Sequence, residues 1–391
     1  MATAPGTRSA LRRIRPDYGL VAVALLCLLS LWPLLQQSGL PNGEDTLYHI
    51  YRAAEMDRTW ARGVLLPRWA ESFYLGYGSP LFHYYAGSTY YVTSTLARLF
   101  ALDALDSARA LIALCMLGGG VGMYLWLRGR LGTLAGVIAA GCYVYSPYFL
   151  FTEPYGRGAL PELLALALFP LALWRYDRLL RGGGAGALAL AALSSAALIV
   201  THNLMALVCS GLLAAWAVWH YLTRRLSRHL EGERHAPRGG GAVGALVALI
   251  LGVGLAAFFW LPVMAERDAV RLENLTAVSQ LDYRNFFVPL PDLLAVSPRV
   301  DAGALNSLNN QYNLGVAQWI LALTGLVAGL SQPRTRALAL FLTLAALALI
   351  ALMLPQAEPL WAALPPLAYL QFPWRLLGPV GALLAALAGF N

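Results

Sequence analysis

The sequence predicts an all-α polytopic membrane protein, and three observations support this fold class. Of its 391 residues, 59% are hydrophobic, which is more than one water-soluble core can bury. Only 12% are charged, against about 25% in an ordinary soluble domain. The apolar residues also form runs near the length of about 20 residues that a helix needs to cross a bilayer. This composition excludes a soluble enzyme and a disordered chain.

Ten apolar runs predict about ten transmembrane helices within a single transmembrane domain that covers residues 1–391. We expect the first run to be a retained anchor, because it is longer than a usual signal-peptide core and no small-residue cleavage site follows it. The last run is short and reaches the end of the sequence, so we expect the chain to be part of a longer protein. The runs lie near residues 18–36, 107–127, 133–151, 160–177, 186–201, 203–222, 243–262, 316–331, 337–354 and 376–390.

The charge distribution predicts that the N-terminus lies in the cytoplasm. With that orientation the inner loops hold 16 of the 28 arginines but only four of the 20 acidic residues. Such an excess of positive charge in short inner loops is what the positive-inside rule requires. The net charge of +8 therefore reports topology and gives no reason to expect nucleic-acid binding.

Two further counts limit the chemistry. The chain contains no lysine, so it cannot use a Schiff-base lysine or a phosphate-loop lysine. Its four cysteines lie inside apolar runs and form no CxxC pair, which is typical of buried residues rather than of a zinc site.

We expect the chemistry on the outer face, where the longer polar segments lie. The large outer loops are residues 37–106 and 263–315, and shorter ones are 151–162 and 355–375. The first loop is rich in tyrosine and tryptophan, which favour the boundary between lipid and water, so it predicts one or two interfacial helices. An extra transmembrane pair is the alternative, and the charge distribution argues against it.

The first outer loop opens with PNGEDTLYHIYRAAEMDRTWARG. Asn42 or Gly43 is expected to cap a helix whose first turn holds Asp45. Asp45, His49 and Arg52 have i, i+4, i+7 spacing and share one helical face. A carboxylate beside an imidazole can accept a proton or bind a divalent cation. The alternative is an ordinary first-turn acid with a surface histidine.

The second acidic segment is FTEPYGRGALPE, which holds Glu153, Arg157 and Glu162. Charged residues at a membrane edge are costly unless they are paired or functional. One reading is a structural Glu–Arg pair. In the other, Glu153 joins Asp45 in holding a metal or an acceptor, and Arg157 binds phosphate through its planar fork.

Two later polar positions have weaker signals. The stretch YLQFPWRLLGP places Trp374 and Arg375 before the final run, either as interfacial anchors or, for Arg375, as part of a phosphate clamp. His202 and Asn203 lie between two runs, where an interhelical hydrogen bond explains them as well as a functional role does.

The stretch GEDTLYHIYRAAEMDRTWARGVLLPRW…LGYGSPLFHYY is similar to a bacterial membrane family labelled 6-pyruvoyl-tetrahydropterin synthase-related. An acid outside the first span, interfacial helices and a second acidic turn also resemble the GT-C superfamily of glycosyltransferases. That resemblance implies a bacterial plasma membrane, an active outer face, and membrane lipids and a polyprenyl-phosphate-linked sugar as partners. The family label does not imply pterin chemistry, because the chain lacks the His-rich zinc site of a soluble pterin synthase.

For individual residues, the resemblance implies that Asp45 is the general base or a metal ligand. Glu153 matches the second acidic position, which usually carries aspartate. A divalent cation would then be held by Asp45, His49 and Glu153, and the phosphate by three arginines, Arg52, Arg157 and Arg375. The reaction expected is a single displacement that inverts the sugar.

Two other classes of function stay open. The first is a transporter or flippase of lipid-linked sugars, and the second is a non-catalytic scaffold with a GT-C-like fold. Transporters often show internal repeats and polar groups near mid-span. The sequence shows no clear repeat and its charges gather at the outer edge, which favours the enzyme.

Overall fold

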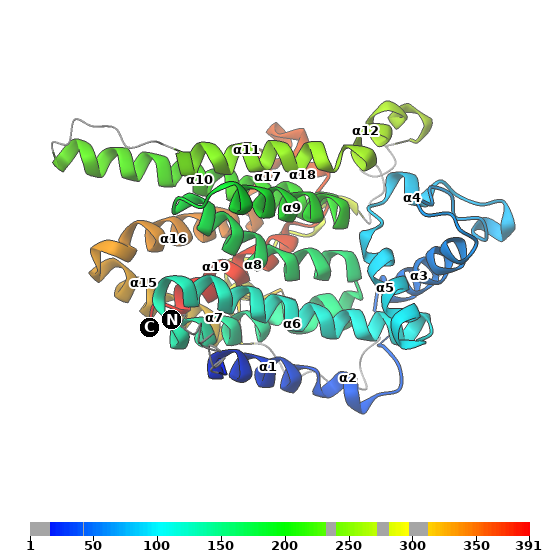
Figure 1. The fold of residues 1–391 in the computed structure, drawn as a ribbon, viewed down its shortest axis with the longest axis horizontal. Helices are drawn as coiled ribbons and strands as arrows, with labels where there is room; N and C mark the ends of the chain where they lie inside the picture. Colours follow the sequence, from blue (N-terminus) through cyan, green and yellow to red (C-terminus); the bar gives the residue numbers. More distant parts are fainter. Residues whose placement is uncertain (1–15, 42, 232–239, 272–280, 297–311) are drawn as a thin grey trace, which may run out of the picture.

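The computed structural model describes residues 16–41, 43–231, 240–271, 281–296 and 312–391. This part of the chain is helical, and its one β-type contact is an isolated bridge between Ala70 and Ser79. The long helices run side by side, and a group of short helices lies at one end of them (Figure 1).

The longer helices form the bundle. They are α1 (Tyr18–Ser30), α6 (Ala104–Leu131), α7 (Thr133–Val144), α8 (Leu160–Leu180), α9 (Ala185–Thr201), α10 (Asn203–Glu231), α11 (Gly240–Leu255), α15 (Val316–Ser331), α16 (Pro333–Met353) and α19 (Leu377–Ala388). Shorter helices connect them. These are α2 (Trp32–Gln36), η2 (Tyr148–Arg157), α12 (Ala257–Ala265), η3 (Arg267–Ala269), η5 (Tyr283–Asn285), α14 (Leu290–Leu294), η7 (Pro355–Ala357), α17 (Glu358–Ala363), α18 (Pro365–Ala368) and η8 (Pro373–Leu376).

Each of the ten apolar runs falls on one or two of these helices, which confirms the all-α membrane fold class. Four described helical stretches are long and apolar enough to cross a membrane: Ala104–Leu131, Thr133–Arg157, Asn203–Ser227 and Pro333–Met353. A fifth results if α11 and α12, which are bent by 64°, form one span. Ten separate spans are not confirmed. Four apolar helices, namely α1, α9, α15 and η8 with α19, have at most 17 residues, and α8 is longer but is not among the candidate spans.

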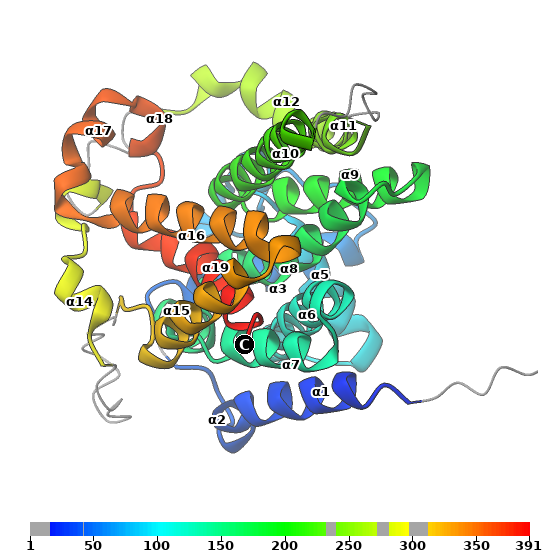
Figure 2. The same ribbon diagram turned by 90° about the vertical axis from the view of Figure 1, so that its left-hand side faces the viewer.

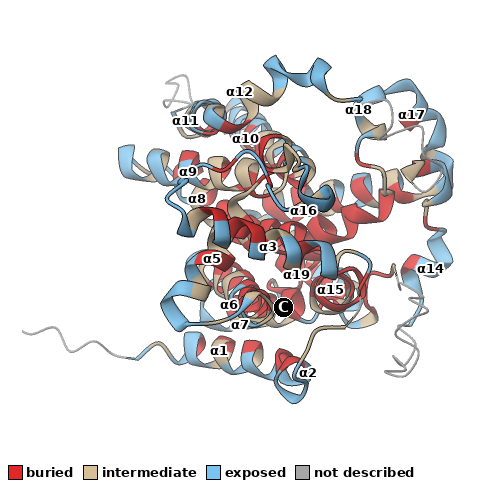
Figure 3. Ribbon diagram, turned by 90° about the vertical axis from the view of Figure 1, so that its right-hand side faces the viewer, coloured by how far each residue is buried: buried red, intermediate tan, exposed pale blue. Residues whose placement is uncertain are grey.

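The centre of the bundle is tightly packed. Figure 2 looks along the helices and shows α19 among α7, α8, α15 and α16, and every residue of α19 is buried. Buried residues concentrate on these central helices, while the outer helices carry exposed faces (Figure 3). Exposed apolar side chains such as Leu29 and Ile250 lie on those outer faces, as expected for helices in contact with lipid.

The first predicted outer loop forms α3 (Thr46–Ala61), η1 (Tyr74–Gly76), α4 (Leu81–Tyr84) and α5 (Ser88–Phe100). Figure 1 shows these helices at the right-hand end of the bundle, and none of them is among the candidate spans. The segment is therefore a set of short helices at the end of the bundle, and it adds no transmembrane pair. Parts of the other large loop, residues 272–280 and 297–311, lie outside the described residues.

The predicted start of the first of these helices was wrong. Asn42 lies outside the described residues, and Gly43 is not the cap. The N-cap position belongs to Asp45, whose side chain makes no capping hydrogen bond, and the helix begins at Thr46. A tertiary contact accounts for this start, because the backbone just before the helix is hydrogen-bonded to the second acidic segment.

Candidate functional site

Two segments that are distant in sequence are joined at this end of the bundle. The backbone N–H of Asp45 donates to the carbonyl of Arg157 at 2.7 Å, and that of Glu44 donates to the carbonyl of Gly156 at 3.4 Å. These bonds fix the beginning of α3 against the end of η2. The two acidic segments that the sequence analysis singled out separately therefore meet in one place.

Gly158 allows the end of η2 to approach the beginning of α3 closely. It follows η2 with φ of +67°, a left-handed conformation that favours glycine. A Cβ atom there would lie 1.9 Å from Oγ1 and 2.8 Å from Cα of Thr46. The second contact is with backbone, so the beginning of α3 would have to move to admit a side chain.

We therefore expect Gly158→Ala to lower the free energy of unfolding by about 1–3 kcal/mol, through overpacking and backbone strain. Chemical unfolding in detergent measures this loss. Gly182→Ala is the matched control, because Gly182 also has positive φ, +97°, but has no atom within 4 Å of an added Cβ. Equal losses in the two variants would show that backbone strain alone, and not the contact with α3, is responsible.

The centre of the site is a buried arginine. The Arg157 side chain is only 2% exposed, and its Nη1 donates to Glu153 and, at 3.0 Å, to Glu162. Its Nη2 lies 3.8 Å from Oδ2 of Asp45. The two glutamates are fully buried. Glu153 and Arg157 thus form the structural pair that the sequence analysis considered, although they form it as part of a larger cluster.

Glu162 links that pair to other helices. Its Oε1 accepts from the Tyr148 hydroxyl at 2.8 Å, and its Oε2 lies 3.1 Å from Nε of Arg375 and 3.9 Å from Nε2 of His202. No catalytic or binding role was predicted from the sequence for Glu162, Tyr148 or His202. The available signal for Glu162 was a carboxylate in the first turn of a strongly apolar helix, where an unpaired charge is costly.

An aromatic wall closes one side of the cluster. The Arg157 guanidinium lies 4.7 Å from the Trp374 ring centroid, and Trp374 stacks on Tyr312 and Phe372 with centroids 4.4 and 4.8 Å away. Cation–π contact of this kind stabilises a buried guanidinium. Trp374 and Arg375 are both buried, so their interpretation as exposed interfacial anchors is wrong.

Asp45 is the solvent-exposed carboxylate of this cluster. Its side chain is 42% exposed, in contrast to the two buried glutamates. Arg52, on the same helix, is half-buried, and its guanidinium lies 4.7 Å above the Tyr85 ring. The structure therefore places an accessible acid, and a half-buried arginine that interacts with it electrostatically, at the edge of a buried ionic cluster.

His49 is a buried residue of this region, so the alternative of a surface histidine is wrong. It is 2% exposed, and its Nδ1 lies 2.8 Å from the Tyr90 hydroxyl. Burial, aided by the positive charges of Arg52 and Arg157, holds the pKa of His49 well below its usual value of 6.5. The imidazole is therefore neutral at neutral pH.

This shift predicts a pH dependence of stability. Below pH 6.5 the histidine of the unfolded chain binds a proton that the folded chain does not, so stability falls with pH from about 6.5 downward, by up to about 1.4 kcal/mol per pH unit. We expect His49→Gln to lose less stability than wild type between pH 7.5 and 5.5 in chemical unfolding. His229→Gln, at an exposed histidine, should behave as wild type. A slope unchanged by His49→Gln would rule out this origin.

The predicted metal ligands do not form a metal-binding group. Within the described residues, no three His, Cys, Asp or Glu side chains are arranged to hold a metal ion. His49 is bonded to Tyr90, and Glu153 is bonded to Arg157. The donor set therefore does not fit the divalent cation that we expected at Asp45, His49 and Glu153.

Comparison with known proteins identifies a family. Residues 82–390 match the family described as "6-pyruvoyl-tetrahydropterin synthase related domain; membrane protein". The match includes the second acidic segment and begins after Asp45. A comparison with curated proteins gives no match.

Solved structures show a similar fold. ArnT from Cupriavidus metallidurans, bound to undecaprenyl phosphate, has a TM-score of 0.54 and 17% identity over 95% of this chain and 58% of its own. The oligosaccharyltransferase of Archaeoglobus fulgidus in the apo form has a TM-score of 0.57 and 15% identity over 96% of this chain and 50% of its own. The chain thus spans between half and three fifths of the length of these proteins. The likeness shows that the chain has a fold similar to that of these two proteins.

Proposed function

The chain belongs to the 6-pyruvoyl-tetrahydropterin synthase-related family of membrane proteins, and we propose that it is a glycosyltransferase that uses a polyprenyl-phosphate-linked sugar. One observation supports this most strongly. A half-exposed acid, Asp45, lies against a buried cluster of arginines and glutamates at one end of a GT-C-like bundle. The similar ArnT structure holds undecaprenyl phosphate, a polyprenyl phosphate.

In the proposed reaction Asp45 is the general base. Its carboxylate removes the proton of the acceptor hydroxyl as that oxygen attacks the anomeric carbon of the sugar. The bond from the anomeric carbon to the phosphate oxygen breaks, and the electron pair leaves with the lipid phosphate. A single displacement of this kind inverts the anomeric configuration. A well-placed base contributes roughly 10²–10⁴-fold to such a rate.

Of the three arginines expected to bind phosphate, the arrangement favours Arg52. Within the described residues its guanidinium has no carboxylate partner within 4.0 Å, and it is half-buried beside Tyr85. Arg157 and Arg375 are both engaged with Glu162. We assign to these two the role of holding the acidic cluster and Asp45 in position, with their positive charge also stabilising the departing phosphate.

An apolar cavity beside the site supports a lipid carrier. It measures about 520 Å³ and lies between the α1–α2 segment and η2. Trp32, Leu34 and Phe151 are among its lining residues, and so is Pro41, which is near Asp45 in sequence. Burial of methylene groups there would favour a long isoprenoid tail.

We further propose that the site faces the outside of a bacterial plasma membrane. The support is the excess of arginine in the loops at the opposite end. In this topology α8 and the four shorter apolar helices also cross the membrane, to give about ten spans in one transmembrane domain.

The test is a transfer assay. Purified protein in nanodiscs is incubated with radiolabelled polyprenyl-phosphate sugars and a lipid and glycan extract of the host, with and without added divalent cation. We expect label to move into a new glycoside. If label stays on the carrier for every sugar tried, the proposal fails. Vesicle assays then separate a flippase, which moves labelled lipid across the bilayer, from a scaffold, which does not.

A further inference from the structure

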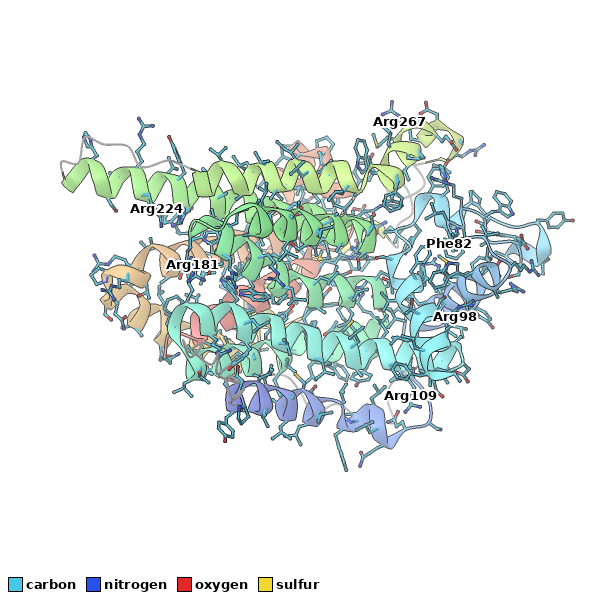
Figure 4. All side chains as sticks on the ribbon, viewed as in Figure 1. Phe82, Arg98, Arg109, Arg181, Arg224 and Arg267 are labelled. Carbon is cyan, nitrogen blue, oxygen red and sulfur yellow. The ribbon has the colours of Figure 1, made fainter. Side chains whose placement is uncertain are left out.

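A polar cavity, separate from the apolar one beside η2, lies at the opposite end of the bundle from Asp45. It measures about 440 Å³, and it is lined by residues of α6, α10 and α16 and of the turn after α8. Figure 4 shows two of its residues, Arg181 and Arg224, toward the left-hand end, whereas Phe82 and Arg98 of the α3–α5 region lie at the right. The cavity is therefore separate from the proposed glycosyltransferase site.

The lining of this cavity is strongly basic. Four arginines from four segments converge on it, namely Arg130, Arg181, Arg224 and Arg334. The carboxylate that faces them is Asp177, which is fully buried and pairs with Arg130 and, at 2.9 Å, with Arg181. In the part of the chain that the structure describes, Arg224 and Arg334 have no carboxylate within 4.0 Å. Among the described residues, four guanidinium groups therefore share a single carboxylate.

The rest of the lining gives the cavity a fixed wall. Trp216 is buried with the Arg130 guanidinium 5.9 Å from its ring centroid, and the Trp219 indole N–H donates to the carbonyl of Ala337 at 2.7 Å. This hydrogen bond from Trp219 joins α10 to α16, the helices that carry Arg224 and Arg334. Arg224 and Arg334 thus project from helices that are fixed relative to each other.

We propose that this cavity, the arginine cavity, binds a phosphate ester. Uncompensated guanidinium groups attract anions, and their planar forks match the oxygens of phosphate. The volume lies within the range of small-ligand sites, roughly 300–1,000 Å³. Basic pockets between membrane helices are also known to hold the headgroups of anionic lipids. The ligand comes either from an anionic phospholipid or from a soluble phosphate. This inference does not rest on the proposed glycosyl transfer.

The decisive variant replaces Arg224 and Arg334. In the double variant Arg224→Gln/Arg334→Gln the buried pairs of Asp177 stay intact, and both changed side chains are exposed, so we expect normal folding. The matched control is Arg225→Gln/Arg336→Gln, which removes the same charge from exposed neighbours that do not line the cavity. Unfolding temperatures of all three proteins check that each is folded.

Two probes distinguish the sources of the ligand. Inorganic phosphate is titrated calorimetrically, and phosphatidylglycerol is measured by native mass spectrometry against phosphatidylcholine. We expect saturable binding of at least one probe to wild type, weakened about tenfold or more in the Arg224/Arg334 variant and less than twofold in the control. Binding of phosphatidylglycerol alone assigns a lipid headgroup, and binding of phosphate alone assigns a soluble ester. The proposal is overturned if neither probe binds saturably, or if the control weakens binding as much.

Discussion

Replacing Asp45 by asparagine is expected to reduce sugar transfer about 10²–10⁴-fold while the protein stays folded. Asparagine keeps the size of the side chain and removes the basic oxygen. The side chain is 42% exposed and its closest charged partner, Arg157, also pairs with two buried glutamates, so the fold does not depend on Asp45. Initial rates of label transfer at saturating donor, with wild type and variant in the same nanodiscs, measure the effect.

Glu71→Gln is the matched control for Asp45→Asn. It neutralises another exposed acid of the same end of the molecule, whose partner Arg62 is also exposed. We expect its transfer rate to stay within twofold of wild type. If Asp45→Asn keeps full activity, Asp45 is not the base. If both variants lose activity equally, the effect comes from the charge of this surface rather than from one carboxylate.

The largest effect on stability is expected at Arg157. Arg157→Gln would leave the buried carboxylates of Glu153 and Glu162 without their main counter-charge. Breaking a buried ion pair from one side typically costs about 3–5 kcal/mol, because the remaining charge has lost its solvation. We therefore expect a loss of that size in the free energy of unfolding, measured by chemical denaturation in detergent.

Two further variants test this explanation. Arg62→Gln removes an arginine from an exposed pair with Glu71 and should cost no more than about 1 kcal/mol. The double variant Arg157→Gln/Glu153→Gln removes one of the stranded carboxylates, so it should be more stable than Arg157→Gln alone. If the second substitution brings no recovery, the loss at Arg157 reflects packing against Trp374 rather than unpaired charge.

Much of the fold could be predicted because it depends on local apolar composition. All ten apolar runs proved to be helices, and residues 37–106 proved to be a set of short helices at the end of the bundle. The number of spans could not be settled in this way. Hydropathy does not reveal that a helix ends before its apolar run does, as α1 ends at Ser30. Nor does it reveal that a run bends, as the chain does between α11 and α12.

The candidate site was predicted in part. Asp45, Glu153, Arg157 and Arg375 do lie in one cluster, and Arg52 lies at its edge. The role of each side chain was harder to predict from the sequence, because it depends on whether the side chain is buried. His49 shared a predicted helical face with Asp45, yet it is buried against Tyr90. That placement results from the packing of α3 on α5, which no spacing in the sequence encodes.

The sequence by itself determined that this is a helical membrane protein with polar segments that carry candidate chemistry, because hydrophobicity and charge act residue by residue. Tertiary structure alone decided which charges pair. Glu162 became the link between Arg157 and Arg375 through side-chain ion pairs. Asp45 became the exposed acid of the cluster, where a backbone hydrogen bond joins it to Arg157, about 110 residues later in the sequence. The physical reason is that a charge near a membrane must find a partner or reach water, and only the folded chain shows which of the two is available.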